Sequence, residues 1–366
     1  MVNKLKILHL LPLHKVPPIG HGGTERIVWH LVREQVRNGH DVTILASPGS
    51  SISGARIVTY YGKKRGTSNP FTEWFFNKLE ISKQVMKSYL HADKSEFDIV
   101  HGHYSESCTS LSFMKRTGNI TTHHGTTMTR IVPYTILHLS ALTTRGKVVT
   151  ISKSEYSIMK NVWKDNLVGY VHHGFPLDVF KFVEKPHKEH EIELGFLARI
   201  APFKGTHLAI GIADKLKSMG YDTRLRIIGG VYDRYAEYGR RIATMANDRD
   251  YVHFIPNAPD NVVDLLLSSV DVMLYPYLWP EPFSMGIVES GARGTPSIAF
   301  NIGSASEILA HEKTGFLCSD VDSAADMVTK IQEIQRTDVR KHMETYFSSN
   351  TMYKKYLGIY EKILEG

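Results

Sequence analysis

The sequence predicts an α/β protein built from two doubly wound domains, each a mainly parallel sheet with helices between its strands. Short apolar runs alternate with segments whose apolar residues recur at helical spacing, which is typical of this class. The alternation stops over 176–193, where prolines and charged residues dominate, and then restarts. A length of 366 residues also fits two domains. We therefore expect a first domain over 1–175, a linker over 176–193, a second domain over 194–350, and a C-terminal helix in 351–366 that is a candidate to cross back to the first domain.

The first half opens with a strand over 6–11, an apolar run that Pro12 closes. A helix is expected over 24–36, because apolar residues recur there every three or four positions, and Asn38 and Gly39 end it. Further short apolar or β-branched runs predict the other strands of this sheet: 42–46, 57–60, 97–101, 120–123, 148–151 and 169–172.

The second half repeats the pattern, with helices expected over 208–216 and 287–292 and a C-terminal helix over 352–364. Ligands of open α/β sheets lie beyond the carboxyl ends of the strands, so two such domains facing each other would place a site in the cleft between them. The strands of the second sheet are predicted at 194–197, 225–228, 252–255, 272–275 and 297–300.

Charge and cysteine content exclude several classes of protein. The formal net charge of +7 suits an anionic ligand, but the basic residues are spread along the chain, so we expect no nucleic-acid partner. Two cysteines, Cys108 and Cys318, exclude a disulfide scaffold and a cysteine-ligated zinc site and favour a cytoplasmic protein. The N-terminal apolar run lacks a small-residue cleavage site, and no stretch of about 18 residues is free of charges and helix breakers. We therefore expect neither a signal peptide nor a transmembrane helix.

A glycine-rich loop, with Gly22 and Gly23 followed by Thr24 and Glu25, separates the first strand from the first helix. Glycine lets a backbone approach an anion closely, and the free N–H groups at the start of the following helix favour a phosphate. The loop does not match the dinucleotide-binding pattern G-x-G-x-x-G. Two interpretations stay open at this point: contact with a phosphate or sugar, and a flexible loop.

In the second half, Arg199 and Lys204 share the loop between the first strand and the first helix. Arginine grips phosphate oxygens with two N–H groups, lysine adds a point charge, and the helix N-terminus adds its dipole. The pair suits a diphosphate, and a solvated pair of surface cations is the plain alternative.

A second loop and helix carry two carboxylates, Glu281 and Glu289, with seven residues between them. The first lies on the loop and the second about one and a half turns into the helix, so the two would meet different parts of one extended ligand. Carboxylates accept hydrogen bonds from both hydroxyls of a vicinal diol. Backbone N–H groups of Phe283, Ser284 and Met285 would face an anion between them.

These motifs resemble those of retaining glycosyltransferases of family 4, which have the GT-B fold of two Rossmann-like domains facing a central cleft. The carboxylate pair resembles the E-x7-E motif of that family. The stretches GGTERIVWHLV, LARIAPFKGTHLAI, YLWPEPFSMGIVESGARGTPSIAF and EKTGFL resemble it in order and spacing over nearly the whole chain. The resemblance implies a retaining, metal-independent transfer of a sugar from a UDP- or GDP-sugar to an acceptor hydroxyl, without a cofactor, in the biosynthesis of a glycan, glycolipid or glycoconjugate.

The resemblance also implies roles for individual residues. Arg199 and Lys204 would neutralise the diphosphate, Glu281 would hold hydroxyls of the transferred sugar, and Glu289 would hold the ribose diol. His124 would be the catalytic histidine near the reacting sugar, and His123 is the alternative candidate for that role. The other donor-binding residues that the resemblance implies are Gly22, Gly23, Thr24, Gly229, Gly230, Phe283, Ser284 and Met285.

Two positions depart from the family pattern. Ser284 stands where the family usually has glycine, which keeps a backbone N–H group but puts a close approach of the ligand in doubt. Arg293 occupies a place usually taken by a small or thiol residue.

Several alternatives stay open. Histidines follow three strands of the first half, but no carboxylate has a matching close spacing, so no metal is expected. The triplets 248–250 and 320–322, each D-x-D, read as solvated turns. Segment 61–90 combines a basic run with aromatic residues; a helix packed on the first domain is the favoured interpretation, and a peripheral contact with an anionic membrane at its inner face is the alternative.

The substrate-level predictions are broad. The acceptor is a sugar, a lipid-linked molecule or a small molecule, and the oligomeric state is not predicted. A sugar-nucleotide epimerase or phosphorylase on the same fold, and a non-catalytic protein that binds nucleotide sugars, are the alternative functions.

Overall fold

The structure, a computed structural model, describes residues 4–11, 15–18, 23–59, 96–103, 118–125, 146–185 and 190–365. The chain divides into two compact units. Unit 1 comprises Met1–Phe175 with Ser349–Gly366, and unit 2 comprises Pro176–Ser348. The backbone N–H of Ser349 donates to the carbonyl of Phe175 at 2.7 Å, so the chain leaves unit 1 and returns to it at hydrogen-bonded residues.

Unit 1 contains a parallel sheet with the strand order β3-β2-β1-β4-β5-β6-β7. The order reverses between β1 and β4, which makes the carboxyl ends of these two strands the switch point of the sheet. The strands are β1 (Lys6–Leu11), β2 (Asp41–Ala46), β3 (Arg56–Thr59), β4 (Ile99–Gly102), β5 (Asn119–His123), β6 (Lys147–Thr150) and β7 (Leu167–Tyr170).

Three helices are described in unit 1: α1 (Gly23–Arg37), α5 (Lys153–Trp163) and α13 (Ser349–Glu365). Helix α1 buries Val28 and Val32 against the sheet, because apolar residues four positions apart lie on one face. Helix α5 begins after Ser152, whose hydroxyl caps it by accepting a hydrogen bond from the N–H of Glu155.

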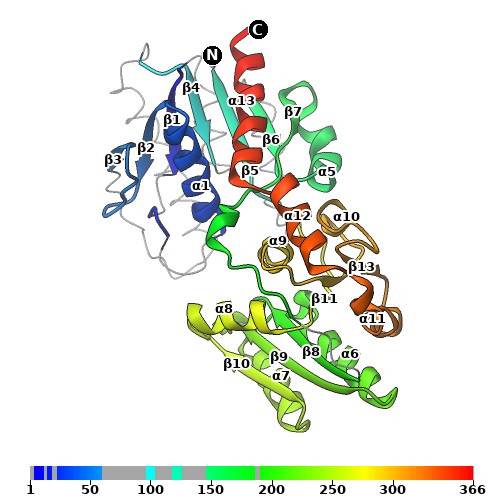
Figure 1. The fold of residues 1–366 in the computed structure, drawn as a ribbon. Helices are drawn as coiled ribbons and strands as arrows, with labels where there is room; N and C mark the ends of the chain where they lie inside the picture. The colour runs from blue at the N-terminus through cyan, green and yellow to red at the C-terminus, as the bar shows by residue number, and fades with distance from the viewer. Residues whose placement is uncertain are drawn as a thin grey trace. The chain divides into compact units, whose positions relative to one another are not determined.

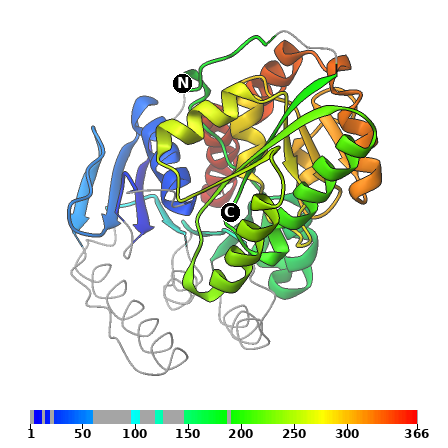
Figure 2. The same ribbon diagram turned by 90° about the horizontal axis from the view of Figure 1, so that it is seen from below.

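Helix α13 returns to unit 1 from the far end of the sequence and packs against α1 (red and blue in Figures 1 and 2). Its buried face carries Tyr353, Tyr356 and Tyr360, which are spaced by three and four residues. Their hydroxyls bond to His40, Thr122 and other polar groups of the sheet region. The helix is therefore held to unit 1 by both apolar packing and buried hydrogen bonds.

Unit 2 contains a second parallel sheet, with the strand order β10-β9-β8-β11-β12-β13. Its order reverses between β8 and β11. The strands are β8 (Glu191–Leu197), β9 (Asp222–Gly229), β10 (Val252–Pro256), β11 (Val272–Tyr275), β12 (Ser297–Phe300) and β13 (Gly315–Cys318).

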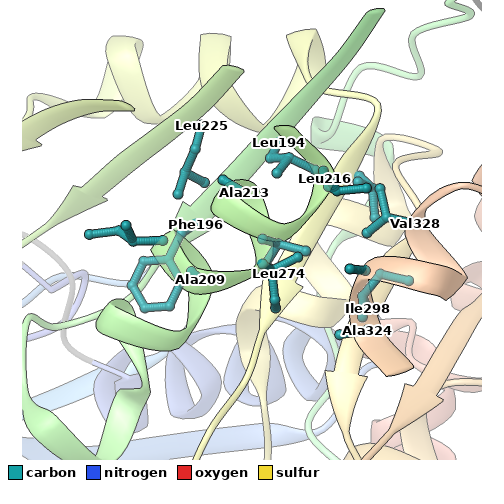
Figure 3. Packing of buried hydrophobic residues seen from close by; sticks show 14 of the residues in the cluster. Leu194, Phe196, Ala209, Ala213, Leu216, Leu225, Leu274, Ile298, Ala324 and Val328 are labelled. Carbon is teal, nitrogen blue, oxygen red and sulfur yellow. The ribbon is translucent and has the colours of Figure 1, made fainter. Parts of the chain in front are cut away.

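The helices of unit 2 form two packed groups. Helix α6 contacts α7 and α11, whereas α9 contacts α8 and α12. Buried strand residues such as Leu194 and Leu274 pack with Ala209, Ala213 and other residues of α6 to form one apolar core (Figure 3). The helices of unit 2 are α6 (Thr206–Ser218), α7 (Ala236–Asn247), α8 (Asp260–Ser269), α9 (Met285–Ala292), α10 (Ala305–Ile308), α11 (Val321–Val328) and α12 (Arg336–Tyr346).

The segment that follows Phe175 is bound to unit 2 by arginines of α12. Arg340 donates to the carbonyls of Leu177 and Phe180 at 2.7 and 2.9 Å, and Arg336 donates to that of Val183 at 3.0 Å. Strand β8 begins at Glu191. Most of the segment that the sequence marks as a linker is therefore either fixed on unit 2 or outside the described residues.

The two parallel α/β sheets confirm the predicted fold class. Two strands differ most from the prediction, and helices α5, α7, α8, α10, α11 and α12 correspond to no helix that the sequence analysis expects. The strand expected over 169–172 is β7 (Leu167–Tyr170), where buried Leu167 is followed by exposed Val168 and Tyr170. This edge strand has one face in solvent, so it lacks the continuous apolar run that marks a central strand. The sequence pattern also does not predict β13, whose four residues include Gly315 and Cys318.

Candidate functional site

The candidate site of unit 2 lies at the switch point of its sheet. The loop after β8 carries Arg199 and Lys204, and the loop after β11 carries Glu281. Because β8 and β11 are neighbours and parallel, both loops leave from the same edge of the sheet. The sheet order thus brings together residues that are far apart in the sequence.

Lys204 and Glu281 form an ion pair. The Nζ of Lys204 donates to Oε2 of Glu281 at 2.6 Å and lies 4.2 Å from the centre of the Tyr277 ring. The lysine side chain is only 8% exposed, whereas that of the glutamate is 25% exposed. Burial lowers the pKa of Lys204, although the Glu281 carboxylate opposes this shift. The pair therefore places a largely desolvated ammonium group beside a partly accessible carboxylate.

Tight backbone contacts fix the geometry of this pair. Gly205 has φ +70°, and a Cβ atom there would lie 1.9 Å from the carbonyl oxygen of Pro276. The N–H of Leu278 donates to the carbonyl of Phe203 at 2.9 Å, which joins the two loops. Gly303 lies against the backbone of Glu281, where a Cβ would come within 2.6 Å of its nitrogen. Both loops are consequently held by close contacts that glycine alone permits.

Arg199 differs from Lys204 in its surroundings. Its side chain is exposed and lies beside the rings of Phe203 and Tyr232, with its Cζ 5.8 and 5.9 Å from their centres. Within the described residues, no carboxylate forms an ion pair with it. The guanidinium group is therefore the accessible cation of this site.

Helix α9 and the residues just before it carry the other residues of the second loop that are predicted to contact a donor. Ser284 is its buried N-cap residue and Met285 its first residue, so the N–H groups of the first turn are not used within the helix. Phe283 and Glu289 are buried as well. The structure gives a reason for the arginine at position 293, where the family usually has a small or thiol residue. Arg293 is buried and donates to the carbonyl of Glu289 at 2.9 Å and to the carboxylate of Asp264 in α8, so it joins α9 to α8.

Gly229 and Gly230 end β9 and make structural contacts. A Cβ on Gly229 would lie 1.8 Å from the carbonyl oxygen of Ala198, and Gly230 accepts a hydrogen bond from the N–H of Ile200 at 3.0 Å. The Asn257 side chain accepts from the N–H of residue 231 at 3.3 Å. These glycines allow the end of β9 to pack closely against the loop that carries Arg199.

A cavity of about 170 Å³ lies at the opposite edge of the same sheet, near the beginnings of β8 and β11. Four of its charged side chains pair with one another: Lys185 with Asp271 at 2.7 Å and Arg226 with Glu193 at 2.8 Å. We therefore place the candidate site at the carboxyl edge, where Arg199 remains accessible.

Unit 1 carries a second polar cluster at its own switch point. His9 of β1 and His101 of β4 are register partners, and His103 follows β4. All three are fully or almost fully buried. His124, just after β5, lies at the end of the cluster with its Nε2 3.2 Å from Nδ1 of His103, and its ring stacks on that of His173. The carboxyl edge of this sheet is therefore lined by imidazoles.

The structure separates the two histidines that the sequence left as rivals. His123 is buried, and its Nε2 lies 3.2 Å from the carboxylate of Glu155 in α5. His124 instead joins the histidine cluster, and Glu25 of α1 lies near enough to oppose the lowering of its pKa by burial and by neighbouring histidines. The start of α1 and His124 thus share one region of unit 1.

Burial holds most of this cluster neutral. It lowers the pKa of His9 to about 4 and that of His173 to about 3, and it lowers those of His101 and His103 well below 6.5. Each group therefore binds a proton less readily in the folded protein than in the unfolded chain.

Acidification is expected to destabilise unit 1. As the pH falls below about 6.5 toward 4, the unfolded chain takes up protons that the folded unit does not, so the free energy of unfolding decreases by up to about 1.4 kcal/mol per pH unit for each such histidine. Hydrogen exchange of the full chain at pH 7.5 and 5.5, corrected for the intrinsic exchange rates, measures the change. Protection of β1, β4 and β5 that stays constant over this range would contradict the assignment.

Several other predicted residues and segments lie at helix starts or outside the described residues. Gly23 and Thr24 are the first residues of α1, whereas Gly22 and segment 61–90 lie outside the described residues. Of the two D-x-D triplets, 320–322 forms a helix cap, in which Asp320 accepts from the N–H of Ser323 at 2.8 Å. Among the helices that the structure describes, none is long and apolar enough to cross a membrane.

Sequence reasoning missed several residues of both clusters. His9 interrupts an apolar strand, and such a break is a signal for a buried polar partner. Tyr277 and Gly303 contact the Lys204–Glu281 pair; the first lies within a quoted motif but is given no role there, and the second belongs to no motif.

Comparison with known proteins follows the division into two halves. Residues 21–188 match the family described as Glycosyltransferase Family 4, and residues 179–350 match the family described as Glycosyl transferases group 1. YtcC of Bacillus subtilis, which is named as a glycosyltransferase, is 29% identical over 184 residues, covering 46% of this chain and 45% of YtcC. The capsular polysaccharide biosynthesis glycosyltransferase CapM of Staphylococcus aureus is 25% identical over 60% of this chain and 62% of its own length. The chain thus spans less than two thirds of these relatives.

Solved structures share the fold along the whole chain. A glycosyltransferase from Rickettsia africae has a TM-score of 0.75 at 20% identity, covering 100% of both chains. Anabaena HepE, determined in complex with UDP and glucose, has a TM-score of 0.71 at 14% identity, covering 98% of this chain and 99% of its own. At these identities the likeness establishes the fold alone.

Proposed function

We propose that this chain, whose two halves match two glycosyltransferase family models and whose fold is shared by solved glycosyltransferases, transfers a sugar from a nucleoside diphosphate sugar to an acceptor hydroxyl. The observation that carries the proposal is the grouping of Arg199, Lys204 and Glu281 at the carboxyl edge of the second sheet. A diphosphate requires accessible positive charge, and a sugar requires a carboxylate that accepts hydrogen bonds from its hydroxyls. This edge offers both.

The cations serve the leaving group. When the bond between the sugar and the diphosphate breaks, negative charge develops on the diphosphate oxygen. Arg199 offers two N–H groups to this charge, and Lys204 offers an ammonium group whose burial strengthens its electrostatic effect. The unused N–H groups at the start of α9 add to this stabilisation. We propose that these groups neutralise the diphosphate without a metal ion.

The carboxylates serve the sugar and the nucleoside. We assign Glu281 to hydroxyls of the transferred sugar, because it is fixed by the contact with Gly303 and remains partly accessible. Glu289 is assigned to the ribose diol, with Gly229 and Gly230 near the nucleotide. Backbone N–H groups at 283–285 complete the donor contacts.

Unit 1 is assigned the contacts with the reacting sugar. The proposed groups are Gly23 and Thr24 at the start of α1, Gly22 before them in the sequence, and the imidazole of His124. Transfer with retention of the anomeric configuration follows if the acceptor hydroxyl attacks from the side that the diphosphate leaves. The departing diphosphate then takes the proton of the acceptor, so that no side chain acts as the general base.

The proposed donor and acceptor are each given as a class of molecules. The donor is a UDP- or GDP-sugar, and the acceptor is a sugar, a lipid-linked molecule or a small molecule of glycan or glycolipid biosynthesis. We propose a cytoplasmic location, with a peripheral contact at the inner face of the membrane when the acceptor is lipid-linked.

A donor panel tests this proposal. The purified chain is incubated with UDP-, GDP- and ADP-sugars in EDTA, and release of the nucleoside diphosphate is measured beside the variant Glu281→Gln, which keeps the shape of the side chain but removes its charge. We expect release from one donor, reduced about 100-fold or more in the variant. Release of a sugar 1-phosphate, or conversion of the donor to an isomer, would instead identify a phosphorylase or an epimerase. NMR of the product anomer with an added acceptor tests retention.

A further inference from the structure

Four side chains of unit 1 form one continuous row of hydrogen bonds. Oε1 of Gln35 lies 2.7 Å from Nε2 of His9, Nδ1 of His9 lies 2.8 Å from Nε2 of His103, and Nδ1 of His103 lies 3.2 Å from Nε2 of His124. Each imidazole uses one nitrogen toward each neighbour. The row therefore runs from a buried amide in α1 to the predicted catalytic histidine.

The amide of Gln35 gives this row a direction. Its Nε2 donates to the hydroxyl of Tyr360 at 3.3 Å, so its Oε1 accepts from Nε2 of His9. A neutral imidazole carries one N–H group, so Nδ1 of His9 must accept from His103, and Nδ1 of His103 must accept from Nε2 of His124. His124 is thereby left with a bare Nδ1. That nitrogen is shielded from solvent and has no hydrogen-bond partner among the described residues.

We propose that Gln35, acting through His9 and His103, fixes the tautomer and orientation of His124 so that its Nδ1 accepts a hydrogen bond from a sugar hydroxyl. Gln35, His9 and His103 are positioning residues, since they act on the ligand only through His124. The inference rests on the proposed function, because it takes the ligand of His124 to be a sugar. An unprotonated nitrogen receives an O–H group and repels an anionic oxygen, so the row selects a hydroxyl over a phosphate at this point.

Burial supports this assignment by keeping the row neutral. It lowers the pKa values of His9, His103 and His124, and a protonated ring in the row would have to donate in both directions. The row also does not serve as a path for protons, because it ends at the amide of Gln35, which is not a base. Its effect is to hold and polarise His124.

The same histidines could instead hold a metal ion. Ligand atoms of His9, His101 and His103 lie within 4.8 Å of one another. The hydrogen bonds already account for both nitrogens of His101, which lie 2.7 Å from the hydroxyls of Tyr360 and Thr122. The Nδ1 of His9 and the Nε2 of His103 are at hydrogen-bond distance from each other. We therefore assign these atoms to the row, and metal content is measured in the test.

The test compares the row with a matched control in the same unit. Gln35→Met keeps the volume of the side chain but removes the acceptor that sets the direction. His40→Asn changes another buried histidine, which bonds to the N–H of Leu5 and to Tyr353 and lies outside the row. Both variants remove buried hydrogen bonds of unit 1, so a purely structural effect would appear in both.

Tautomers are read by ¹⁵N NMR of the imidazoles of the full chain, with the His124 signals assigned through His124→Gln. We expect His124 to carry its proton on Nε2 in the wild-type protein and in His40→Asn, and a mixture of tautomers in Gln35→Met. A wild-type His124 protonated on Nδ1, a tautomer unchanged in Gln35→Met, or one bound zinc ion per chain would overturn the proposal.

The second part of the test measures kcat/KM for sugar transfer in the same variants. We expect Gln35→Met to lower kcat/KM about 10- to 100-fold, as loss of a positioning partner does elsewhere, while His40→Asn keeps the wild-type value per folded molecule. Equal losses in both variants would reduce Gln35 to a structural residue and overturn the proposal. If the wild-type chain transfers no sugar, the proposed function fails, and the NMR arm still decides whether Gln35 sets the tautomer.

Discussion

Lys204→Met is expected to lower kcat/KM for sugar transfer about 100- to 1,000-fold while the chain remains folded. Methionine keeps the length and apolar stem of lysine but removes the ammonium group that lies 2.6 Å from Glu281. A preorganised charge aimed at a developing diphosphate contributes about 3–4 kcal/mol to the stability of the transition state. The measurement is steady-state transfer with the donor found in the panel, together with thermal unfolding of the variant.

The double variant Lys204→Met/Glu281→Gln tests whether the unpaired carboxylate causes the loss of stability. In the single variant the Glu281 carboxylate loses its partner, which we expect to destabilise unit 2 by about 1–3 kcal/mol. Removing both charges should recover most of that stability without recovering transfer. If the double variant is no more stable than Lys204→Met, the loss of stability does not come from the unpaired Glu281 carboxylate.

Gly205→Ala is expected to cost more than about 4 kcal/mol of stability and to abolish transfer. The new Cβ would lie 1.9 Å from the carbonyl oxygen of Pro276, in a backbone conformation with φ +70° that alanine rarely adopts. The loop after β8 would have to move away from the loop after β11, which separates Lys204 from Glu281. Thermal unfolding and hydrogen exchange of the two loops in the full chain measure the effect.

Gly220→Ala provides the matched control. Gly220 also has a left-handed backbone, with φ +92°, but a Cβ there meets no atom within 4 Å. Its substitution carries only the conformational penalty of about 1 kcal/mol. The difference between the two variants therefore isolates the clash with Pro276. Similar losses of stability in both would show that the close approach of the two loops is unimportant.

The sequence predicts the central strands well because they are buried on both faces. The runs that contain Ile7, Ile44 and Leu274 are mostly apolar, and these three side chains are fully buried in a sheet. Strand β7 is shifted from its predicted place because an edge strand alternates buried and exposed residues. The amide of Gln35 is equally hard to predict, since a glutamine in a helix is usually solvated.

The candidate site is only partly predictable for a different reason. The motifs identify Arg199, Lys204 and Glu281 one by one, because each stands near glycines or prolines at a strand end. The pairing of Lys204 with Glu281 joins residues 77 positions apart, and the bond from Gln35 to Tyr360 spans 325. Such pairings depend on strand order and on the path of α13, which local pattern does not contain. The sequence therefore suggests the components of the site but not the bonds among them.

Because α13 belongs to unit 1, the sequence of unit 2 lies between two segments of unit 1. Unit 2 is one continuous stretch inserted between Phe175 and Ser349, whereas unit 1 is assembled from segments on either side of it. On the ribosome, unit 2 is therefore complete before unit 1 has received Tyr356 and Tyr360, which bond to Thr122, His101 and Gln35. The half of the protein that is synthesised first is the half that finishes folding last.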